Sequence, residues 1–390
     1  MNRVVRPYRL PVVSLAVGLA AFGLVETAAA QSSRDKVLST IVDATKAVGA
    51  KSVTLGAVSG DDAKFTVATT TIVTEAEGKK STMTFGPATY TGAKPTADGG
   101  YTIDELVAEK FSAGADDGKL TAERIVVRNY VGQPAAKLKP GAVNGEKFER
   151  IEATGLVATS EDGKTVPIAS VAVAASDYVG DRPRKGSFEM KGLTVPLDPK
   201  DPDMAQVTAL GYSTLSLDVA MSGAWDDKTG RLDVPALSIA AADMGSLKLS
   251  FVLGGLTPEV VAQLEKAGAD EAKQMELLQG LTIEKVALRY DDASFATRFM
   301  GKQAKDQGVD TKTYAKQLKV MLPMVVSMIG NKDFEKKVVS AAGAFLEAPK
   351  SLTLSAAPKQ PLPVSQIMGA AMMAPQTLPT VVGAEVSAND

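Results

Sequence analysis

The stretch "GSLKLSFVLGGL", from Gly245 to Leu256, alternates between apolar and polar residues with a period of two. Successive side chains of a β-strand point to opposite faces, so the pattern predicts a strand with one apolar face. Its apolar positions are Leu247, Leu249, Phe251 and Leu253. The stretch "STLSLDVAM" alternates in the same way, with Leu215 and Leu217 on its apolar side. These six residues form the candidate binding face for an apolar ligand.

The alternation changes phase inside two other predicted strands. In "RLDVPALSIA" it changes at Pro235, and in "LTIEKVALRY" it changes between Ile283 and Val286. A β-bulge, which is one extra residue in one strand of a pair, changes the phase in this way and bends the strand. We therefore expect bulges at both places and a strongly bent sheet.

Short Asp-, Glu- and Gly-rich turns recur along the first two thirds of the chain, each between runs that contain β-branched residues. Pairs such as Asp-Gly supply the positive φ angles of tight hairpins, so each turn predicts two antiparallel neighbours. The turns are "SGDDAK" from Ser59, "EAEGKK" from Glu75, "TADGGY" from Thr96, "ADDGKL" from Ala115, "SEDGKT" from Ser160 and "DDKTGR" from Asp226. The series predicts a β-meander.

Two of these hairpin units resemble each other beyond the turn. "DDGKLTAERIVVRNYVGQP" begins at Asp116 and "EDGKTVPIASVAVAASDYVGDRP" at Glu161, and both reach a Tyr-Val-Gly sequence, at Tyr130 and Tyr178. Internal duplication explains the likeness, and chance similarity between two ordinary hairpins is the alternative.

Helix signals begin at Thr257. This residue can cap a helix whose first position is Pro258. A strand from Leu281 to Tyr290 is expected next. Three more helices should follow: one that carries Phe295 and Phe299 and ends at Gly308, one from Thr311 to Ile329 that is bent or broken at Pro323, and one from Asp333 to Leu346. "SLTLSA" from Ser351 should return to strand, and the methionine-rich tail should form a short helix and loop.

The first thirty residues have the pattern of a signal peptide. Arg3, Arg6 and Arg9 precede an apolar run, and Ala28 and Ala30 fit the small-residue rule for cleavage before residue 31. No cysteine follows the expected cleavage point, so no lipid-modified N-terminus is expected. We expect an exported protein located in the periplasm.

The composition excludes many catalytic mechanisms. The chain has no histidine and no cysteine, which removes the commonest general base, thiolate nucleophiles and the usual zinc ligands. The formal net charge of −2, without clustered basic residues, does not suggest a nucleic-acid surface. We expect no enzymatic activity, no cofactor, no metal site and no nucleic-acid partner.

A few residues could carry chemistry but have simpler interpretations. Ser33 and Lys36 have the spacing of serine–lysine enzymes, yet they lie next to the expected new N-terminus, where order is poor. The carboxylate pairs at 291–292 and 226–227 suit a helix cap and a hairpin tip. The loop "DPKDPD", with Asp198, Asp201 and Asp203, lacks the EF-hand spacing for calcium.

Methionines gather in the predicted helical region. They could line an adaptable apolar pocket, although core packing is the default interpretation. They are Met321, Met324, Met328, Met368, Met372 and Met373.

The predicted fold class is α+β and β-dominated: a curled antiparallel β-meander of repeated hairpins with a C-terminal helical region. We expect three parts, a signal peptide at 1–30, an antiparallel β-rich region at 31–256, and a mainly helical region at 257–390 that packs on the sheet. If the helices cover the apolar face, Phe251→Ala should cost about 3–5 kcal/mol. If the face lines a groove, the cost should be roughly 1 kcal/mol or less. Covered sheet faces are commoner, so we expect the larger loss.

The pattern resembles secreted Gram-negative envelope proteins distantly similar to the AsmA/TamB type. The resemblance is carried by the signal peptide, the hairpin series from Lys51 to Leu253 and "LTIEKVALRYDDASFATRFM" from Leu281. The segment "APKSLTLSAAPKQPLPVSQIMGAA" also looks like the ending of uncharacterised secreted proteins without an assigned activity. This chain is shorter than that type, and its helices interrupt the strand series. The resemblance implies a groove of antiparallel strands that handles lipid.

Two functions follow as expectations. The first is a non-enzymatic envelope protein that holds a lipid or another apolar ligand on its sheet. The second is an interaction or scaffold module that docks on another envelope protein through edge strands or through its helical end. A carboxylate-based hydrolase is a distant third.

Overall fold

A computed structural model describes residues 32–76, 79–115, 118–139, 145–268 and 270–390 of the chain. The expected signal peptide lies outside the described residues. In the described part, nineteen strands form antiparallel pairs, and most helices follow Thr257. This confirms the predicted fold class of a β-dominated, antiparallel protein with C-terminal helices.

The chain divides into two compact units. Unit 1 holds the described residues up to Ala174 together with Gly180–Arg182, and unit 2 holds Ala175–Val179 and Pro183–Asp390. The change from strand to helix at Thr257, which the sequence suggested as a boundary, therefore falls inside unit 2. The units are described separately.

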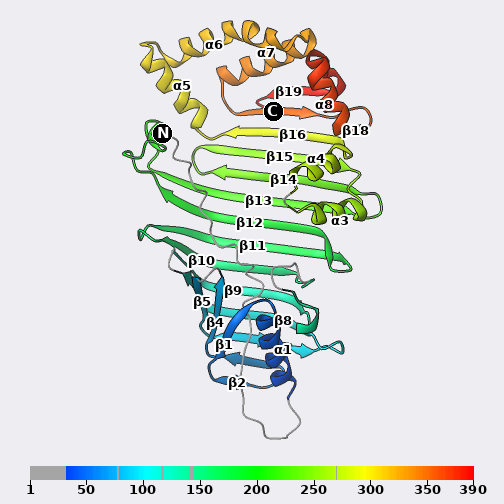
Figure 1. Cartoon of the computed structure of the whole chain (residues 1–390). Coiled ribbons are helices and arrows are strands. Elements are labelled where there is room, and N and C mark those ends of the chain that lie inside the picture. The colour runs from blue at the N-terminus through cyan, green and yellow to red at the C-terminus, as the bar shows by residue number, and fades with distance from the viewer. Residues whose placement is uncertain (1–31, 77–78, 116–117, 140–144, 269) are drawn as a thin grey trace. The chain divides into compact units, whose positions relative to one another are not determined.

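The long strand β8 organises the sheet of unit 1 (Figure 1). On one side β8 pairs with β9, and on the other it pairs in turn with β7, β6 and β5, so that the sheet branches. The strands are β1 (Ala50–Leu55), β2 (Val58–Gly60), β3 (Lys64–Val67), β4 (Thr70–Ala76), β5 (Lys79–Phe85), β6 (Ala88–Thr91), β7 (Lys94–Pro95), β8 (Tyr101–Ala115), β9 (Gly118–Gly132), β10 (Arg150–Ser160) and the first part of β11 (Thr165–Val179). A short 3-10 helix, η1 (Ala135–Lys137), follows β9.

Helix α1 (Ser33–Ala47) fills the apolar side of this sheet. Ser32 caps its N-terminus, because the Ser32 hydroxyl accepts a hydrogen bond from the Asp35 amide at 3.1 Å. Val37, Leu38 and Ile41 are buried on one side of the helix. They share a core with Phe65 and Tyr90, whose rings stack with centroids 4.8 Å apart. The expectation of poor order at Ser33 and Lys36 is therefore wrong, because burial of this helical face holds the segment in place.

All six predicted turns lie between paired antiparallel neighbours, as the sequence indicated. Gly230, in the turn from Asp226, has a φ of +69°, a value that favours glycine. The two similar hairpin units share a further feature. Asn129 and Asp177, each just before its Tyr-Val-Gly sequence, both have positive φ values, of 49° and 58°. The likeness between the units thus extends to the backbone.

The sheet of unit 2 is a ladder in which nearly every strand pairs with the one before it in sequence (Figure 1). β17 pairs with β19, and the short β18 pairs with β16. The strands are β12 (Arg182–Pro196), β13 (Thr214–Asp226), β14 (Arg231–Ala241), β15 (Gly245–Gly254), β16 (Thr282–Asp292), β17 (Ser351–Ala356), β18 (Leu362–Pro363) and β19 (Ala384–Ala388). Strand β19 follows the methionine-rich tail, at residues for which the sequence analysis predicted no element.

The helices of unit 2 follow the sequence signals, except that two helices form between Pro258 and Gln279 where one was expected. Thr257 accepts a hydrogen bond from the Val260 amide at 3.4 Å and so caps α3, and Pro323 lies inside α6. The helical elements are α2 (Ala205–Thr208), α3 (Pro258–Ala267), α4 (Glu271–Gln279), α5 (Phe295–Asp306), α6 (Thr311–Val326), η2 (Ser327–Ile329), α7 (Lys332–Glu347), α8 (Val364–Met373), η3 (Pro375–Thr377) and α9 (Leu378–Val381). None of the described helices has the length and apolar character needed to cross a membrane.

The packing of α1 gives a test of unit 1. Ile41→Ala should lower the free energy of unfolding by about 2–5 kcal/mol, because it leaves a cavity in a close-packed core. Lys36→Ala, at an exposed position of the same helix, should change it by less than about 0.5 kcal/mol. Urea denaturation measures both values. Equal effects of the two variants would show that α1 does not pack on the sheet.

Candidate functional site

The strand register of unit 2 aligns apolar side chains across the sheet. Residues directly opposite each other in an antiparallel pair lie on the same face. Leu249 of β15 opposes Leu237 of β14 and Leu288 of β16. Followed outward in both directions, this row consists of Phe188, Met221, Leu237, Leu249, Leu288, Leu354 and Val386.

A second row runs beside the first on the same face. Leu247 opposes Ile239 on one side and Tyr290 on the other. The complete row is Met190, Val219, Ile239, Leu247, Tyr290, Leu352 and Ala388. We call the surface formed by these two rows and their apolar neighbours on the same side the apolar face.

Bulges keep the apolar side chains on one side. The register of β14 shifts between Val234 and Leu237, at the predicted position around Pro235, and as a result Val234 opposes Phe251. The register between β15 and β16 shifts near Leu253, so that Ile283 and Val286 both face the apolar side despite their different parity. Both predicted bulges are thus confirmed.

All six residues of the candidate binding face lie on the apolar face. Leu247, Leu249, Phe251 and Leu253 follow one another along β15. On β13, Leu215 and Leu217 share the parity of Met221, and they oppose Val195 and Leu193 of β12. The register therefore brings together residues that the sequence could assign only to separate strands.

The apolar face is largely uncovered. Leu247 is 44% exposed, Ile239 48% and Met221 46%. Phe251, Leu249 and Leu253 are half-buried, as are Leu215 and Leu217, and Val234 is a buried exception. The expectation that the C-terminal helices cover this face is therefore wrong for Leu247, Ile239 and Met221.

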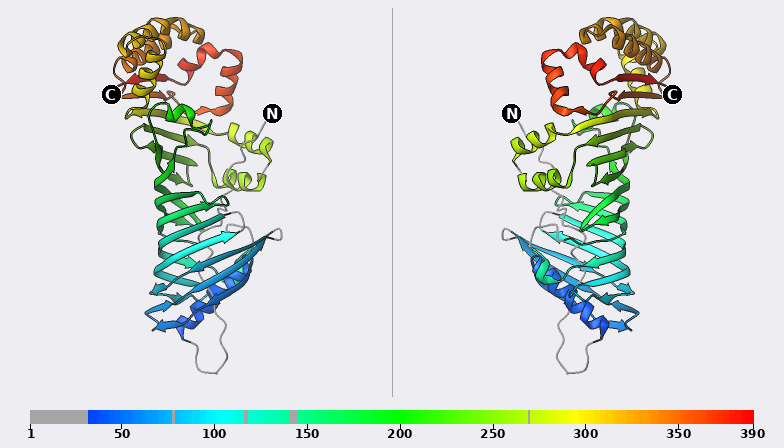
Figure 2. Two further views of the ribbon diagram at one scale, coloured as in Figure 1. Left: turned by 90° about the vertical axis from the view of Figure 1, so that its left-hand side faces the viewer. Right: turned by 90° about the vertical axis from the view of Figure 1, so that its right-hand side faces the viewer.

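The helices meet the sheet mainly at the β17 and β19 end. Phe345 of α7 packs edge-on against Tyr290, with ring centroids 6.1 Å apart. The Asn389 side chain donates a hydrogen bond to the Ala344 carbonyl at 3.0 Å, and Lys337 pairs with Glu385 at 2.6 Å. Figure 2 shows the helices gathered at this end of unit 2, with α3 and α4 set to one side of the ladder. Helix packing therefore leaves the middle of the apolar face open.

The opposite face of the same sheet is polar. Ser238 and Lys248, which oppose each other, lie there with Asp218 of β13. At the far end, Arg289 contacts Asp291 at 2.8 Å and Asp390 at 3.2 Å. Hydrogen bonding to Asp291 raises the pKa of Arg289 above its ordinary value. Such two-sided strands are typical of an antiparallel sheet with one face in water.

The carboxylate pairs have structural partners. Asp292 accepts a hydrogen bond from the Tyr290 hydroxyl at 2.6 Å and one from the Ala296 amide at 2.8 Å, which fixes the start of α5. Burial, and then this bond to Asp292, raise the pKa of Tyr290. Asp226 accepts from the Lys228 amide at the hairpin tip, and Asp227 pairs with Arg184 at 3.2 Å.

The "DPKDPD" loop is held by local hydrogen bonds. Asp198 accepts from the Lys200 amide and Asp201 accepts from the Asp203 amide, each at 2.9 Å. These carboxylates therefore close turns of their own loop. Within the described residues, no group of acidic side chains is arranged to hold a metal ion.

A buried polar group lies in unit 1. The rings of Tyr101 and Tyr130 are 5.8 Å apart, and the Tyr130 hydroxyl is hydrogen-bonded to Glu146. Burial raises the pKa of Glu146, and this bond acts in the opposite direction. The group links the segment before β10 to β8 and β9, so its role is structural.

The methionines of the helical region are exposed, against the core-packing interpretation. Met328 and Met373 are each 89% exposed. We call seven of the exposed apolar side chains on α6, η2 and α8 the methionine surface: Val320, Met321, Met324, Val325, Met328, Met372 and Met373. Sequence reasoning singled out the methionines but missed the two valines. The sequence did carry a signal for these valines, because their spacing along α6 places them on the same side as Met321 and Met324.

Comparison with known proteins adds one finding. A protein-family model described as "Uncharacterized protein" matches residues 238–389. The match begins within β14 and ends just after β19, so it takes in part of the apolar face and helices α3 to α9. No curated protein matches the chain.

The exposure of the apolar face predicts a contrast between two phenylalanines. Phe65→Ala, in the core of unit 1, should cost about 3–5 kcal/mol of unfolding free energy. Phe251→Ala should cost less than this, and Leu247→Ala less than about 1 kcal/mol, because these sites are already partly solvated. Denaturant unfolding with amide hydrogen exchange assigns each loss to its unit. Equal losses for the two Phe variants would mean that the face is covered in solution.

Proposed function

We propose that the protein is a non-enzymatic component of the cell envelope that binds a lipid or another apolar ligand on the apolar face of unit 2. The observation that carries the proposal is the alignment of exposed apolar side chains across successive strands of one sheet. Contiguous apolar surface of this kind is rare on soluble proteins outside interaction sites.

Comparison with unit 1 supports this proposal. The apolar side of the unit 1 sheet is filled by α1, which buries Val37, Leu38 and Ile41 against it. In the described part of unit 2, α7 covers only the β17 and β19 end, and Leu247 and Ile239 remain exposed. A helix therefore covers the apolar side of the sheet in unit 1, whereas much of that side is exposed in unit 2. A bound ligand would cover it in unit 2, as α1 does in unit 1.

An acyl chain suits the chemistry of this surface. Leu, Ile, Val, Met and Phe side chains offer dispersion contacts but no directed hydrogen bonds. Each buried CH2 group contributes about 0.8 kcal/mol, so a chain lying across a few strands would gain enough to offset the cost of ordering it. The surface requires no general base, nucleophile or metal.

The location follows from the sequence pattern. A signal peptide at residues 1–30 would direct the protein to the periplasm, where apolar lipids must cross an aqueous layer. The resemblance to AsmA/TamB-type proteins belongs to the same proposal, because it implies a sheet that handles lipid.

A second candidate function is an interaction module of the envelope. The methionine surface favours it, because exposed methionines on helices form adaptable protein-binding surfaces. The two functions use different parts of unit 2, and variants on each part can therefore separate them.

Two neighbouring substitutions on β14 test ligand binding. Ile239→Glu puts a charge on the apolar face, whereas Ser238→Glu puts the same charge on the polar face, opposite Lys248. Ile239→Glu should weaken the binding of a fluorescent fatty acid by about tenfold or more, corresponding to roughly 1.4 kcal/mol. Ser238→Glu should leave it nearly unchanged.

Native mass spectrometry of protein purified from the periplasm complements the titration. Lipid that copurifies with the parent and with Ser238→Glu, but not with Ile239→Glu, would support the proposal. Equal binding by both variants would place the ligand elsewhere and contradict it.

A further inference from the structure

The methionine surface has no protein partner in the described chain. Val320, Met324 and Met328 are 80%, 67% and 89% exposed, and they are spaced by four residues. At 3.6 residues per turn, this spacing places them on one side of α6 and its continuation. The opposite side packs inward, since Ala315 and Val326 are buried. Three successive turns thus present large apolar side chains to solvent.

Met372 and Met373 extend this surface from a second helix. Asn331 donates hydrogen bonds to the Gln376 carbonyl at 3.0 Å and to the Thr380 hydroxyl at 3.1 Å. These bonds join the short segment between η2 and α7 to the segment after α8. Met328 lies just before the first segment and Met373 just before the second, so the two groups of exposed methionines adjoin.

The segment that carries this surface has a positive formal charge. Residues 295–383 contain eleven Lys and Arg but only five Asp and Glu, a formal net charge of +6, whereas the whole chain has −2. The acidic residues of this region are already engaged. Four pair with lysines, namely Asp306, Asp333, Glu335 and Glu347. The fifth, Asp310, caps α6.

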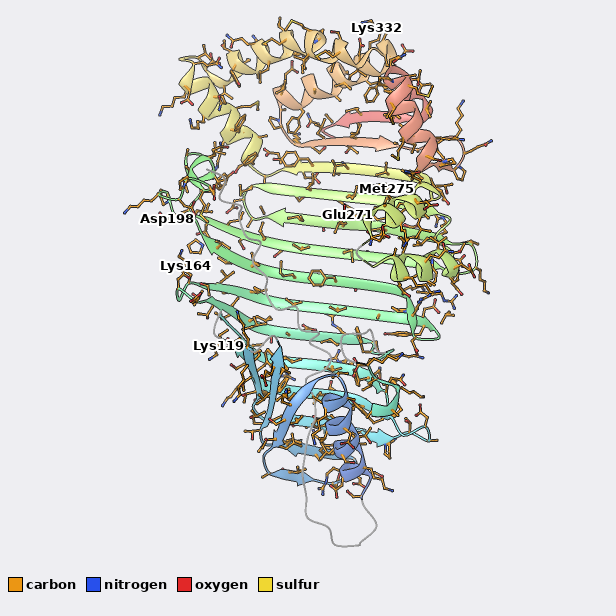
Figure 3. All side chains as sticks on the ribbon, viewed as in Figure 1. Lys119, Lys164, Asp198, Glu271, Met275 and Lys332 are labelled. Atoms are coloured by element: carbon orange, nitrogen blue, oxygen red, sulfur yellow. The ribbon has the colours of Figure 1, made fainter. Side chains whose placement is uncertain are left out.

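Lysines stand at the edge of the apolar stripe. Lys312 and Lys316 lie on α6 in the turns before Val320, and both are exposed. Lys332, labelled in Figure 3, is the first residue of α7 and lies three residues after the end of η2. An exposed apolar stripe bordered by lysines is the pattern of a helix that lies in the interface of a lipid bilayer.

We propose that the methionine surface docks unit 2 onto an anionic lipid bilayer. Val320, Met324, Met328 and Met372 enter the boundary between headgroups and acyl chains, and Lys312 and Lys316 contact anionic headgroups. A second copy of the chain fits less well, because it would bring two sets of lysines together. The proposal does not depend on a ligand at the apolar face.

Vesicle flotation with the full mature chain tests the docking. The parent should bind vesicles of phosphatidylcholine that contain roughly 30 mol% phosphatidylglycerol, and bind pure phosphatidylcholine far less. Binding should weaken as salt is raised, because salt screens exposed charges. Binding that is independent of anionic lipid and of salt would overturn the proposal.

Substitutions separate the apolar and charged contributions. Met324→Glu/Met328→Glu should weaken vesicle binding more than about tenfold, and Lys312→Glu/Lys316→Glu should do the same, since each lysine near an anionic surface contributes about fivefold. Met275→Glu is the control, because Met275 is also an exposed methionine but lies on α4 (Figure 3). It should bind vesicles like the parent. Loss of binding in all three variants would overturn the assignment to this surface.

Three further measurements distinguish the other outcomes. Circular dichroism should show that the exposed substitutions leave the fold intact. Sedimentation velocity should show a monomeric parent. Self-association that Met324→Glu/Met328→Glu abolishes, without vesicle binding, would identify a second copy as the occupant and overturn bilayer docking. Fatty-acid binding by the same variants should be unchanged, so failure here is separable from failure at the apolar face.

Discussion

The two-residue period of the β-strand is the constraint on which unit 2 depends. A shift of one residue moves every following side chain to the other face of the sheet. Without the bulge between Val234 and Leu237, Leu237 and Ile239 of β14 would lie opposite Lys248 and Ser246 rather than opposite Leu249 and Leu247. The bulge near Leu253 does the same for β16. Two local irregularities therefore keep one face apolar across the ladder.

The two units stabilise their sheets differently. In unit 1, α1 buries its apolar side against Phe65, Tyr90 and Leu106. The burial of these complete side chains supplies the stabilising free energy. In unit 2, the central strands rely on ladder hydrogen bonds and on cross-strand contacts between half-buried side chains, each worth roughly 0.2–1 kcal/mol. Unit 2 can therefore leave a surface open, because no single side chain on it carries much of the stability.

Much of this fold could be predicted because its signals are local. Hairpin turns depend on Asp and Gly at the turn itself, the α3 cap on Thr257 and Pro258, and the bulge in β14 on a phase change at Pro235. The covering of the apolar face could not be predicted, since it depends on where α7 packs. Helix α1 had its own signals, in the Ser32 cap and the spacing of Val37 and Ile41. The prediction of poor order rested instead on the nearby expected cleavage site and did not take these helix signals into account.

In the candidate site, too, the features with local signals could be predicted and those that depend on distant residues could not. Parity identified all six residues of the candidate binding face, because each strand carries its own alternation. Nothing in a single strand shows that Leu249 lies between Leu237 and Leu288, since register is set by turns and bulges at a distance. The exposure of the methionines was also out of reach, because an apolar helix stripe has the same pattern whether a neighbour covers it or not.

The edges of the unit 2 sheet bear on how a partner could approach it. An unpaired edge strand invites another chain to add to the sheet, and proteins often cover such edges. At β19, α7 lies alongside, held by the Lys337–Glu385 ion pair and by the bond from Asn389 to the Ala344 carbonyl. Strand addition at this edge would have to displace α7. An incoming molecule instead meets apolar side chains, either on the open face of the sheet or on the methionine surface. The recognition that we propose for unit 2 therefore depends on apolar contact and lysine charge more than on backbone pairing at β19.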